Sequence, residues 1–150
     1  MVYLLFQIGA DRYALESSGI VGVQPCVRLK RIPQAAAGVA GVFDYHGMPV
    51  PVVDLSALAL GQPSRESLST RIVVVRYEGE CLLGLLAEKA VDTARYEEAD
   101  FHDPGVSAEP YLGPVVTDPQ GGIIQRVELA RLLTPEVRGV LWRQAREALS

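Results

Sequence analysis

The sequence predicts an all-β protein of two small five-stranded barrels packed together, with one α-helix at the C-terminal end. Three observations lead to this fold class. Short runs of β-branched and other apolar residues recur along the 150 residues, and 14 glycines and 10 prolines supply turns between them. One strand–turn–strand pattern occurs twice, and helical periodicity is clear only near the C-terminus. Because short strands leave unpaired edges, closed or partly closed barrels are expected.

The chain is organised around Val39–Leu60, which predicts a strand, a turn, a second strand and a short helical turn. Gly47 is suited to positive φ in the turn. Pro49 and Pro51 lack backbone N–H donors and predict that one edge of the second strand pairs incompletely. Asp54 is suited to cap the helical turn.

A weaker copy of this pattern lies at Leu112–Leu133. The matching pairs are Gly47 with Gly121, Asp54 with Glu128, and Leu58 with Leu132. We interpret the copy as a duplicated unit of roughly 70 residues, with chance similarity between common β patterns as the alternative. The polar stretch at residues 61–69 is the expected boundary between the two halves of a single domain covering residues 1–150.

The other elements follow from their patterns. Tyr3–Leu15 predicts a hairpin, and the β-branched run Ile20–Val23 predicts a strand that ends at Pro25. Alternating apolar and basic residues over Val27–Ile32 predict a half-buried strand. The second half predicts a corresponding hairpin and strand, followed by a surface loop with one helical turn, at Thr70–Ala87, Ala90–Ala94 and residues 95–110 respectively.

The C-terminal segment predicts the clearest helix. Thr134 is a suitable N-cap, Pro135 suits the first helical position, and Glu136 complements the positive end of the helix dipole. Apolar residues at helical spacing form one stripe, made of Val137, Val140, Leu141, Ala145, Ala148 and Leu149. Packing against the body of the domain is the expected role of this stripe, and docking of a partner is the alternative.

Composition excludes several functional classes. The net charge of −4 argues against nucleic-acid binding, which requires a basic face. No apolar run reaches the roughly 18 residues of a membrane span, and no signal peptide is recognisable, so we expect a cytoplasmic protein without direct membrane insertion. Cys26 and Cys81 form no CxxC motif and are expected to be reduced, buried thiols.

No catalytic chemistry is indicated. The sequence contains no nucleophile-elbow, metalloprotease or nucleotide-binding motif, and His46 and His102 lack metal-ligand spacing, so we expect no enzyme, metal or cofactor. Asp54 and Glu128 are expected to be helix caps and not an acid/base pair. The acidic residues between 97 and 103 are expected to be a solvated patch.

From Phe6 to Leu133 the chain resembles CheW-like coupling proteins, the adaptors of chemotaxis-type two-component signalling. The resemblance rests on a combination of short motifs: FQIG at residues 6–9, YAL at 13–15, IP at 32–33, GVFDYHGMPVPVVDL at 41–55, TRIVVV at 70–75 and GL at 84–85. It implies two intertwined SH3- or OB-like barrels and no catalysis. It also implies two partners, a chemoreceptor's cytoplasmic helical hairpin and the regulatory domain of a CheA-type histidine kinase, and recruitment to membrane receptor arrays.

Site residues are also carried over from this resemblance. Ile20, Gly41 and Ala90 match family positions near the receptor-binding surface. Two positions depart from the family pattern: Gly22 stands where the family often has Glu, and His46 stands before Gly47 where the family usually has Arg. Neutral histidine does not reproduce the fork-like contacts of arginine. The departures indicate altered partner choice, with drift at a tolerant surface as the alternative.

Within the family, the chain looks most like the Wsp-type adaptors of surface-sensing pathways, which control a diguanylate cyclase response regulator, although flagellar and twitching pathways use similar adaptors. Two other functions stay open. A stand-alone barrel that binds a small ligand or an oligonucleotide would use a basic groove and exposed aromatic residues. An unfamiliar enzyme would need a pocket with a strongly shifted titratable group.

Overall fold

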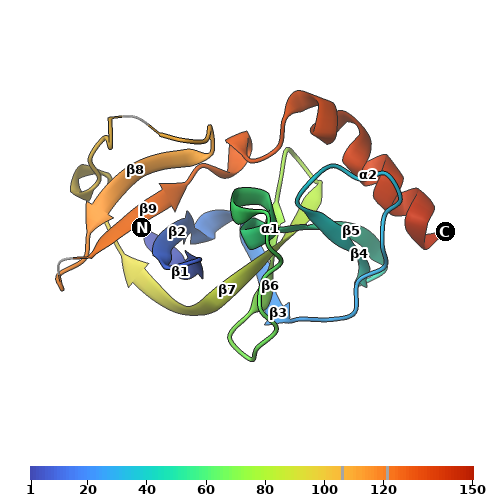
Figure 1. Cartoon of the computed structure of the whole chain (residues 1–150), viewed down its shortest axis with the longest axis horizontal. Coiled ribbons are helices and arrows are strands. Elements are labelled where there is room, and N and C mark those ends of the chain that lie inside the picture. The colour runs from blue at the N-terminus through green and yellow to red at the C-terminus, as the bar shows by residue number, and fades with distance from the viewer. Residues whose placement is uncertain (106, 121) are drawn as a thin grey trace.

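The computed structural model describes residues 1–105, 107–120 and 122–150. Strands dominate these residues, which confirms the all-β prediction (Figure 1). The strands are β1 (Val2–Ile8), β2 (Asp11–Glu16), β3 (Ile20–Pro25), β4 (Val39–Tyr45), β5 (Met48–Asp54), β6 (Arg71–Arg76), β7 (Leu82–Arg95), β8 (Leu112–Thr117) and β9 (Ile123–Val127). The α-helices are α1 (Leu55–Leu60) and α2 (Pro135–Leu149), and short 3₁₀ turns occur at Ser17–Gly19, Glu98–Asp100 and Leu129–Arg131.

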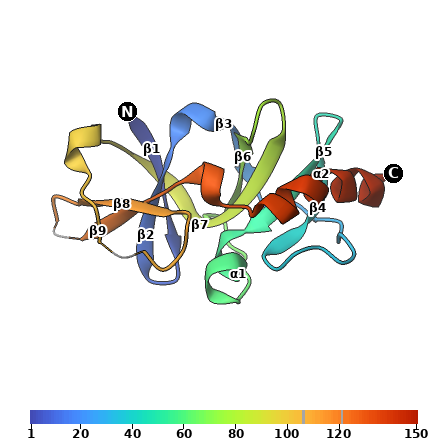
Figure 2. The ribbon, with the colours of Figure 1, turned by 90° about the horizontal axis from the view of Figure 1, so that it is seen from above.

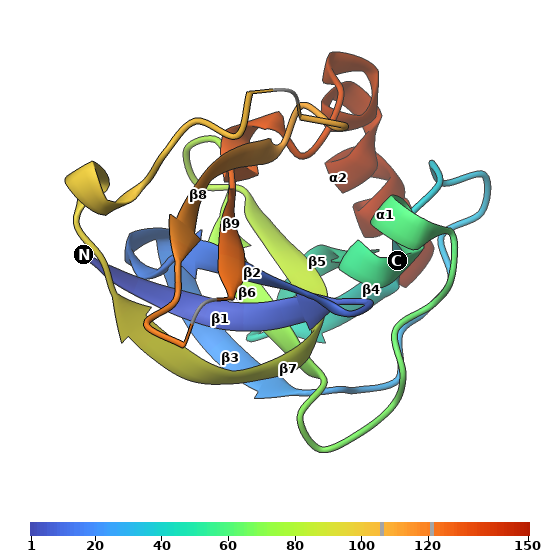
Figure 3. The ribbon, with the colours of Figure 1, turned by 60° about the vertical axis from the view of Figure 1, so that its left-hand side comes forward.

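The strands form two five-stranded sheets that share β7, which curves through both (Figures 1 and 3). Sheet A contains β1, β2, β8, β9 and the C-terminal half of β7. Sheet B contains β3, β4, β5, β6 and the N-terminal half of β7. The β1–β2 hairpin belongs to the first half of the sequence but pairs with β7 and β9 of the second half. The two halves are therefore intertwined, and the stretch at residues 61–69 does not separate two independently paired sets of strands.

The strand pairing repeats between the sheets. In sheet A, β2 pairs antiparallel with β1 and parallel with β9. In sheet B, β7 likewise pairs antiparallel with β6 and parallel with β5. Each sheet also has an isolated antiparallel bridge, Lys30 with Val42 in sheet B and His102 with Val115 in sheet A. This common topology supports the duplication, although Gly121, which the sequence matches to Gly47, lies outside the described residues.

Neither sheet closes into a continuous barrel within the described residues. The hydrogen-bonded order is β3-β6-β7-β1-β2-β9-β8, and β4 joins this path only through β5 and β7. In sheet B the outer strands are therefore β3 and β4, and we call the unpaired gap between them the seam. The edge of β5 that faces β7 pairs only over Val52–Asp54, after Pro49 and Pro51, as the proline spacing predicted.

The hydrophobic core has three parts. One cluster lies on the inner face of sheet A and contains Tyr3, Leu5, Ala14, Val116 and Ile124. A second lies on the inner face of sheet B and contains Phe43, Val50, Val52, Ile72 and Val74. The largest joins both sheets to α2 and includes Phe6, Val53, Leu85, Leu132 and Leu141. Because strands from both sequence halves contribute to the largest cluster, the domain has one shared core.

Two predicted strands differ from the structure. Val27–Ile32 is not a strand: within it only Lys30 pairs, exchanging two 2.8 Å hydrogen bonds with Val42, and Pro25 and Pro33 bracket the segment. The strands predicted at Cys81–Ala87 and Ala90–Ala94 are instead the single long strand β7. Lys89 adopts a φ of 52°, and the register with β1 shifts nearby, so an irregularity bends β7 without ending it.

The predicted caps of the two repeated units behave differently. Asp54 is buried and caps α1, accepting hydrogen bonds from the backbone N–H groups of Ser56 at 3.0 Å and Ala57 at 3.3 Å. Glu128 occupies the equivalent place but makes no side-chain cap bond, so that prediction is wrong. Its carboxylate instead pairs with Arg126 at 3.1 Å.

Helix α2 packs against β4 and β5, as Figures 1 and 2 make visible. Its N-terminus has the predicted cap, with Thr134 accepting a hydrogen bond from the Val137 N–H. Leu141 is fully buried in the shared core. Trp142, which lies outside the predicted stripe, stacks on Tyr77 and donates its indole N–H to the Leu82 carbonyl at 2.8 Å. The helix is therefore seated on its own domain.

An ion pair between Arg12 of β2 and Asp118 of the β8–β9 connection links two hairpins of sheet A. The Arg12 hydrogen bond holds the pKa of Asp118 below its ordinary value of 3.8, outweighing the opposing effect of burial. A lowered folded-state pKa stabilises the fold above the unfolded pKa, and this contribution is lost as pH falls through the folded pKa.

We therefore expect Asp118→Asn to lower the midpoint of thermal unfolding by a constant amount above about pH 5, where the unfolded-state carboxylate is fully ionised. The difference from the unsubstituted protein should shrink as the pH falls below 3.8, the ordinary value for the group. Thermal melts of both proteins between neutral and strongly acidic pH measure it. A difference independent of pH would exclude the ion pair as its cause.

Candidate partner-binding surface

The β4–β5 hairpin turns at His46 and Gly47, with Tyr45 and Met48 as the last paired residues. His46 has a φ of 52° and Gly47 a φ of 87°, the left-handed values that a two-residue hairpin turn requires. The Asp44 carboxylate accepts the Gly47 N–H at 2.7 Å and fixes the turn. His46 and Gly47 are both exposed and lie in the turn that the sequence predicted between the two strands.

Tyr45 connects this turn to the opposite side of the seam. Its ring meets the His46 imidazole edge to face, with ring centroids 4.4 Å apart. Its hydroxyl oxygen lies 2.6 Å from the position that a Cβ on Gly22 would occupy. The structure thus brings together Gly22 and His46, two residues far apart in the sequence, through Tyr45.

The other predicted site residues lie elsewhere. Ile20 is half-buried at the start of β3. Gly41 is buried in β4 with a φ of 152°, and a Cβ there would lie 2.5 Å from the Lys30 carbonyl oxygen. Ala90 is buried in β7, where its N–H donates to the Ser69 carbonyl at 3.0 Å. Gly41 and Ala90 therefore support the backbone and offer no exposed side chain.

A shallow groove of about 160 Å³ lies beside Ala90. Its lining comes from β1, β2, β7 and the segment before β6, and combines apolar and charged side chains: Leu5, Phe6, Gln7, Arg12, Ser69, Lys89, Val91 and Asp92. Val91 is half exposed. Protein-binding surfaces commonly combine apolar and polar side chains in this way.

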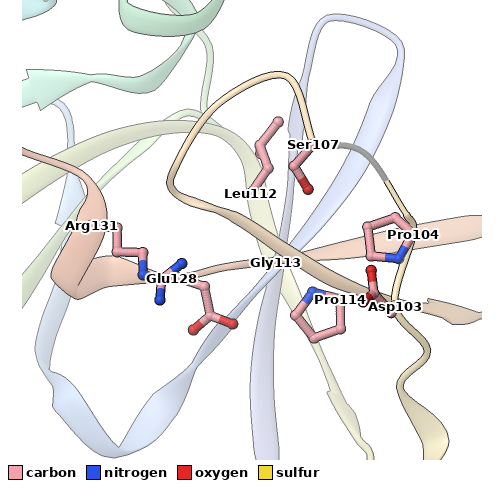
Figure 4. A pocket seen from close by; sticks show the side chains of 8 residues that line it. All are labelled: Asp103, Pro104, Ser107, Leu112, Gly113, Pro114, Glu128 and Arg131. Atoms are coloured by element: carbon pink, nitrogen blue, oxygen red, sulfur yellow. The ribbon is translucent and has the colours of Figure 1, made fainter.

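A larger depression, of about 450 Å³, lies on the sheet A side between β8 and the loop before it (Figure 4). Glu128 and Arg131 place opposite charges on one wall. An oxygen of the Glu128 carboxylate lies 2.4 Å from where a Cβ on Gly113 would be. This carboxylate is engaged by Arg126 at 3.1 Å, so it is held as part of an ion pair.

Near this depression, Arg126 of β9 contacts several acidic and aromatic side chains. Its guanidinium bonds Glu98 at 2.9 Å and Glu128, and lies 4.7 Å from the centre of the Phe101 ring. Burial lowers the pKa of Arg126. The hydrogen bonds and negative charges of its partners raise this pKa by a larger amount, so the net shift is upward. Arg126 is permanently charged and structural, and Glu98, within the predicted solvated acidic patch, is one of its partners.

Among residues 1–105, 107–120 and 122–150, no group of three or more His, Cys, Asp or Glu residues is positioned to hold a metal, and neither α-helix has the length and apolar character of a membrane span. Trp142 of α2 is half-buried and engaged by Leu82, so it offers no free stacking platform.

The cysteines differ from the prediction of burial. Cys26 and Cys81 are both exposed and free, because the first follows the end of β3 and the second lies in the β6–β7 connection. Burial of part of the side chain and the negative charge of Glu66 raise the pKa of the Cys26 thiol. A raised pKa favours the unreactive thiol over the thiolate nucleophile.

Residues 2–137 match the family model of the CheW-like domain. The chain belongs to the CheW-like domain family. This family is non-catalytic, which agrees with the prediction that the domain is not an enzyme. The match spans both sheets and the start of α2, so family membership covers nearly the whole fold.

Relatives of the CheW-like domain are distant. The chemotaxis protein CheW of Helicobacter pylori is 24% identical over 99 residues, covering 66% of this chain and 59% of that protein. The CheW protein of Rhizobium meliloti is 24% identical over 98 residues, covering 65% and 63% respectively. The matched region thus spans less than two thirds of these relatives. Among solved structures, the scaffolding protein TtCheW from Thermoanaerobacter tengcongensis superimposes with a TM-score of 0.80 at 18% identity, covering 91% of this chain and 89% of that one, and confirms the fold.

Sequence reasoning missed Tyr45. Two signals pointed to it: an aromatic residue directly before the turn, and a glycine within the β-branched run of β3. Glycine inside a strand often marks close approach of another group. The pattern gives no distance between residues 22 and 45, however, because they lie on strands that are not paired with each other.

Proposed function

We propose that this CheW-like domain is a non-catalytic adaptor that couples a chemoreceptor's cytoplasmic hairpin to the regulatory domain of a CheA-type histidine kinase. The pathway would be of the chemotaxis type and control motility or surface sensing. The match of residues 2–137 to the CheW-like family carries the proposal. The names of the relatives, chemotaxis protein and scaffolding protein, support the same role.

Two surfaces suit such a bridge. The groove beside Ala90 is lined by both apolar and charged side chains, and we assign the receptor hairpin to it. The seam with its exposed turn at His46 and Gly47 lies on sheet B, and we assign the kinase regulatory domain to it. Gly22 borders the seam from β3, and Ile20, which the resemblance matches to the receptor-binding surface, is the first residue of the same strand. Gly41 and Ala90 act as buried supports of these two surfaces. Binding of both partners would recruit the domain to membrane receptor arrays.

A three-component size-exclusion experiment tests the proposal. The protein is mixed with a receptor cytoplasmic hairpin and a CheA-type regulatory domain from the same genome. We expect one peak containing all three proteins, because the two assigned surfaces do not overlap in their lining residues. The matched variant His46→Arg restores a side chain with fork-like contacts and should change the amount of kinase domain retained, while leaving receptor binding unchanged.

Failure of the folded protein to bind either partner would contradict the adaptor role. It would favour the stand-alone ligand-binding barrel, which a small-molecule screen then tests. Retention of both partners in unchanged amounts by His46→Arg would contradict the assignment of the kinase to the turn, and leave drift as the explanation of His46.

A further inference from the structure

Gly22 lies at a position where the backbone does not require glycine. It has no φ in the left-handed region, and its backbone pairs with Val74 in the β3–β6 ladder. Gly41 differs, because its φ of 152° and the Lys30 carbonyl both exclude a side chain. At Gly22 the three atoms nearest to the position of a Cβ all belong to Tyr45, with the hydroxyl oxygen at 2.6 Å and Cζ at 3.6 Å, so the Tyr45 hydroxyl would have to shift to admit a side chain.

Tyr45 therefore occupies the space that a side chain on β3 would fill. It is the last residue of β4, and Gly22 is in β3, so its ring reaches across the unpaired seam of sheet B. The ring packs at the border of the inner sheet B cluster, 6.0 Å from the Phe43 ring between centroids. Tyr45 thus closes the seam by side-chain contact where the strands make no ladder hydrogen bonds.

The position of this ring also determines the neighbouring surface. The exposed His46 imidazole stands at 74° to the Tyr45 ring, with centroids 4.4 Å apart. If a side chain at residue 22 displaces Tyr45, His46 loses its contact as well. Tyr45 therefore lies against both residue 22 and His46, and we call these three residues the seam triad.

We infer that Tyr45 is a specificity-determining residue: it takes the space of a side chain at position 22 and presents an aromatic Tyr45–His46 edge to the partner in place of a side chain from β3. The inference rests on the proposed adaptor function and refines the kinase-binding surface. Met48, on the same hairpin, is 47% exposed and extends this edge with an apolar side chain. We expect the partner to contact the Tyr45–His46 edge through apolar side chains, and not through one residue of opposite charge.

A double-mutant cycle tests the inference. The variants are Gly22→Ala, Tyr45→Phe and the double variant, and the readout is the Kd for the kinase regulatory domain. Removing the hydroxyl leaves the Cζ atom as the nearest group, at the ordinary contact distance of 3.6 Å. We expect Gly22→Ala to weaken binding about fivefold with Tyr45 present, and to have little effect in the Tyr45→Phe background. The matched control is Gly19→Ala, because a Cβ there meets nothing within 4 Å.

Proton NMR gives a second readout that needs no partner. The chain has two histidines, so a His102→Asn variant assigns the ring signals of His46 directly. Gly22→Ala should shift the His46 signals by moving the Tyr45 ring, and should not shift them when Tyr45→Phe has already removed the hydroxyl. Gly19→Ala should leave them in place.

The outcomes separate the two claims. If the unsubstituted protein binds no kinase domain, the adaptor proposal fails, and the specificity role of Tyr45 fails with it. If it binds and Gly22→Ala leaves both the Kd and the His46 signals unchanged, the adaptor role stands and the inference about Tyr45 is overturned. Equal effects of Gly22→Ala with and without Tyr45→Phe would overturn it too, since the hydroxyl would then not mediate the effect.

Discussion

Replacement of Asp54 by alanine should lower the free energy of unfolding by about 3 kcal/mol, because it leaves one buried and three part-buried donors without their acceptor. Asp54 is 4% exposed. It accepts the backbone N–H groups of Ser56, Ala57 and Ser64, the last at 2.9 Å, and the Ser64 hydroxyl at 2.6 Å. Hydrogen bonds to a charged acceptor stabilise more than neutral ones. One carboxylate thus caps α1 and also fixes the loop that follows it.

Chemical denaturation with urea, followed by circular dichroism, measures this effect. Asp44→Ala is the matched control, because the Asp44 carboxylate also accepts a turn N–H, that of Gly47, but at an exposed position. We expect it to cost less than about 1 kcal/mol, as exposed turn and cap bonds do. Asp54→Asn should fall between the two, since its amide keeps one oxygen acceptor but turns an NH₂ group toward a donor. Equal effects of Asp54→Ala and Asp44→Ala would contradict the role of burial.

The contrast between Asp54 and Glu128 illustrates what the sequence can predict. The repeat placed both carboxylates at the start of a helical turn, and the structure confirms that location for each. Whether the side chain caps depends on its neighbours. Asp54 finds donors from α1 and Ser64, whereas Glu128 lies within reach of Arg126, an ion-pair partner from β9. Arg126 lies only two residues before Glu128 and Ser64 ten residues after Asp54, so the local pattern contains the partners but not the side-chain and loop conformations that bring them into contact.

The same distinction applies to strands and to the site. Local patterns identified the β1–β2 hairpin, the β4–β5 hairpin and the left-handed turn at Gly47, because turn chemistry and β-branched runs act over a few residues. Local patterns did not predict that β7 is continuous, or that within residues 27–32 only Lys30 pairs with β4. Both features depend on which strands lie beside these segments. The role of Tyr45 at Gly22 depends on an unpaired seam, which no sequence period encodes.

Helix α2 leads to the second large prediction, which concerns its packing on its own domain. Leu141 is fully buried in the shared core, which also contains Ile32, Val42 and Val53. Leu141→Ala should lower the free energy of unfolding by about 3 to 4 kcal/mol, the sum of lost apolar transfer and the cavity left behind. The same urea titration measures it, with Trp142 fluorescence as a local probe of the helix seat.

Val140→Ala is the matched control within the same helix. Val140 belongs to the apolar stripe that the sequence predicted, yet it is only half-buried and lies outside the core cluster. Alanine also has higher helix propensity than valine, so we expect a change within about 0.5 kcal/mol in either direction. If Leu141→Ala were no more destabilising than Val140→Ala, α2 would not be seated on its domain in solution, and the helix would have to be treated as a segment for docking a partner. A much larger loss in the free energy of unfolding for Leu141→Ala than for Val140→Ala would assign the stripe to the core. If Val140→Ala also retains the kinase domain and the receptor hairpin unchanged, the seam and the groove stay as the surfaces for partners.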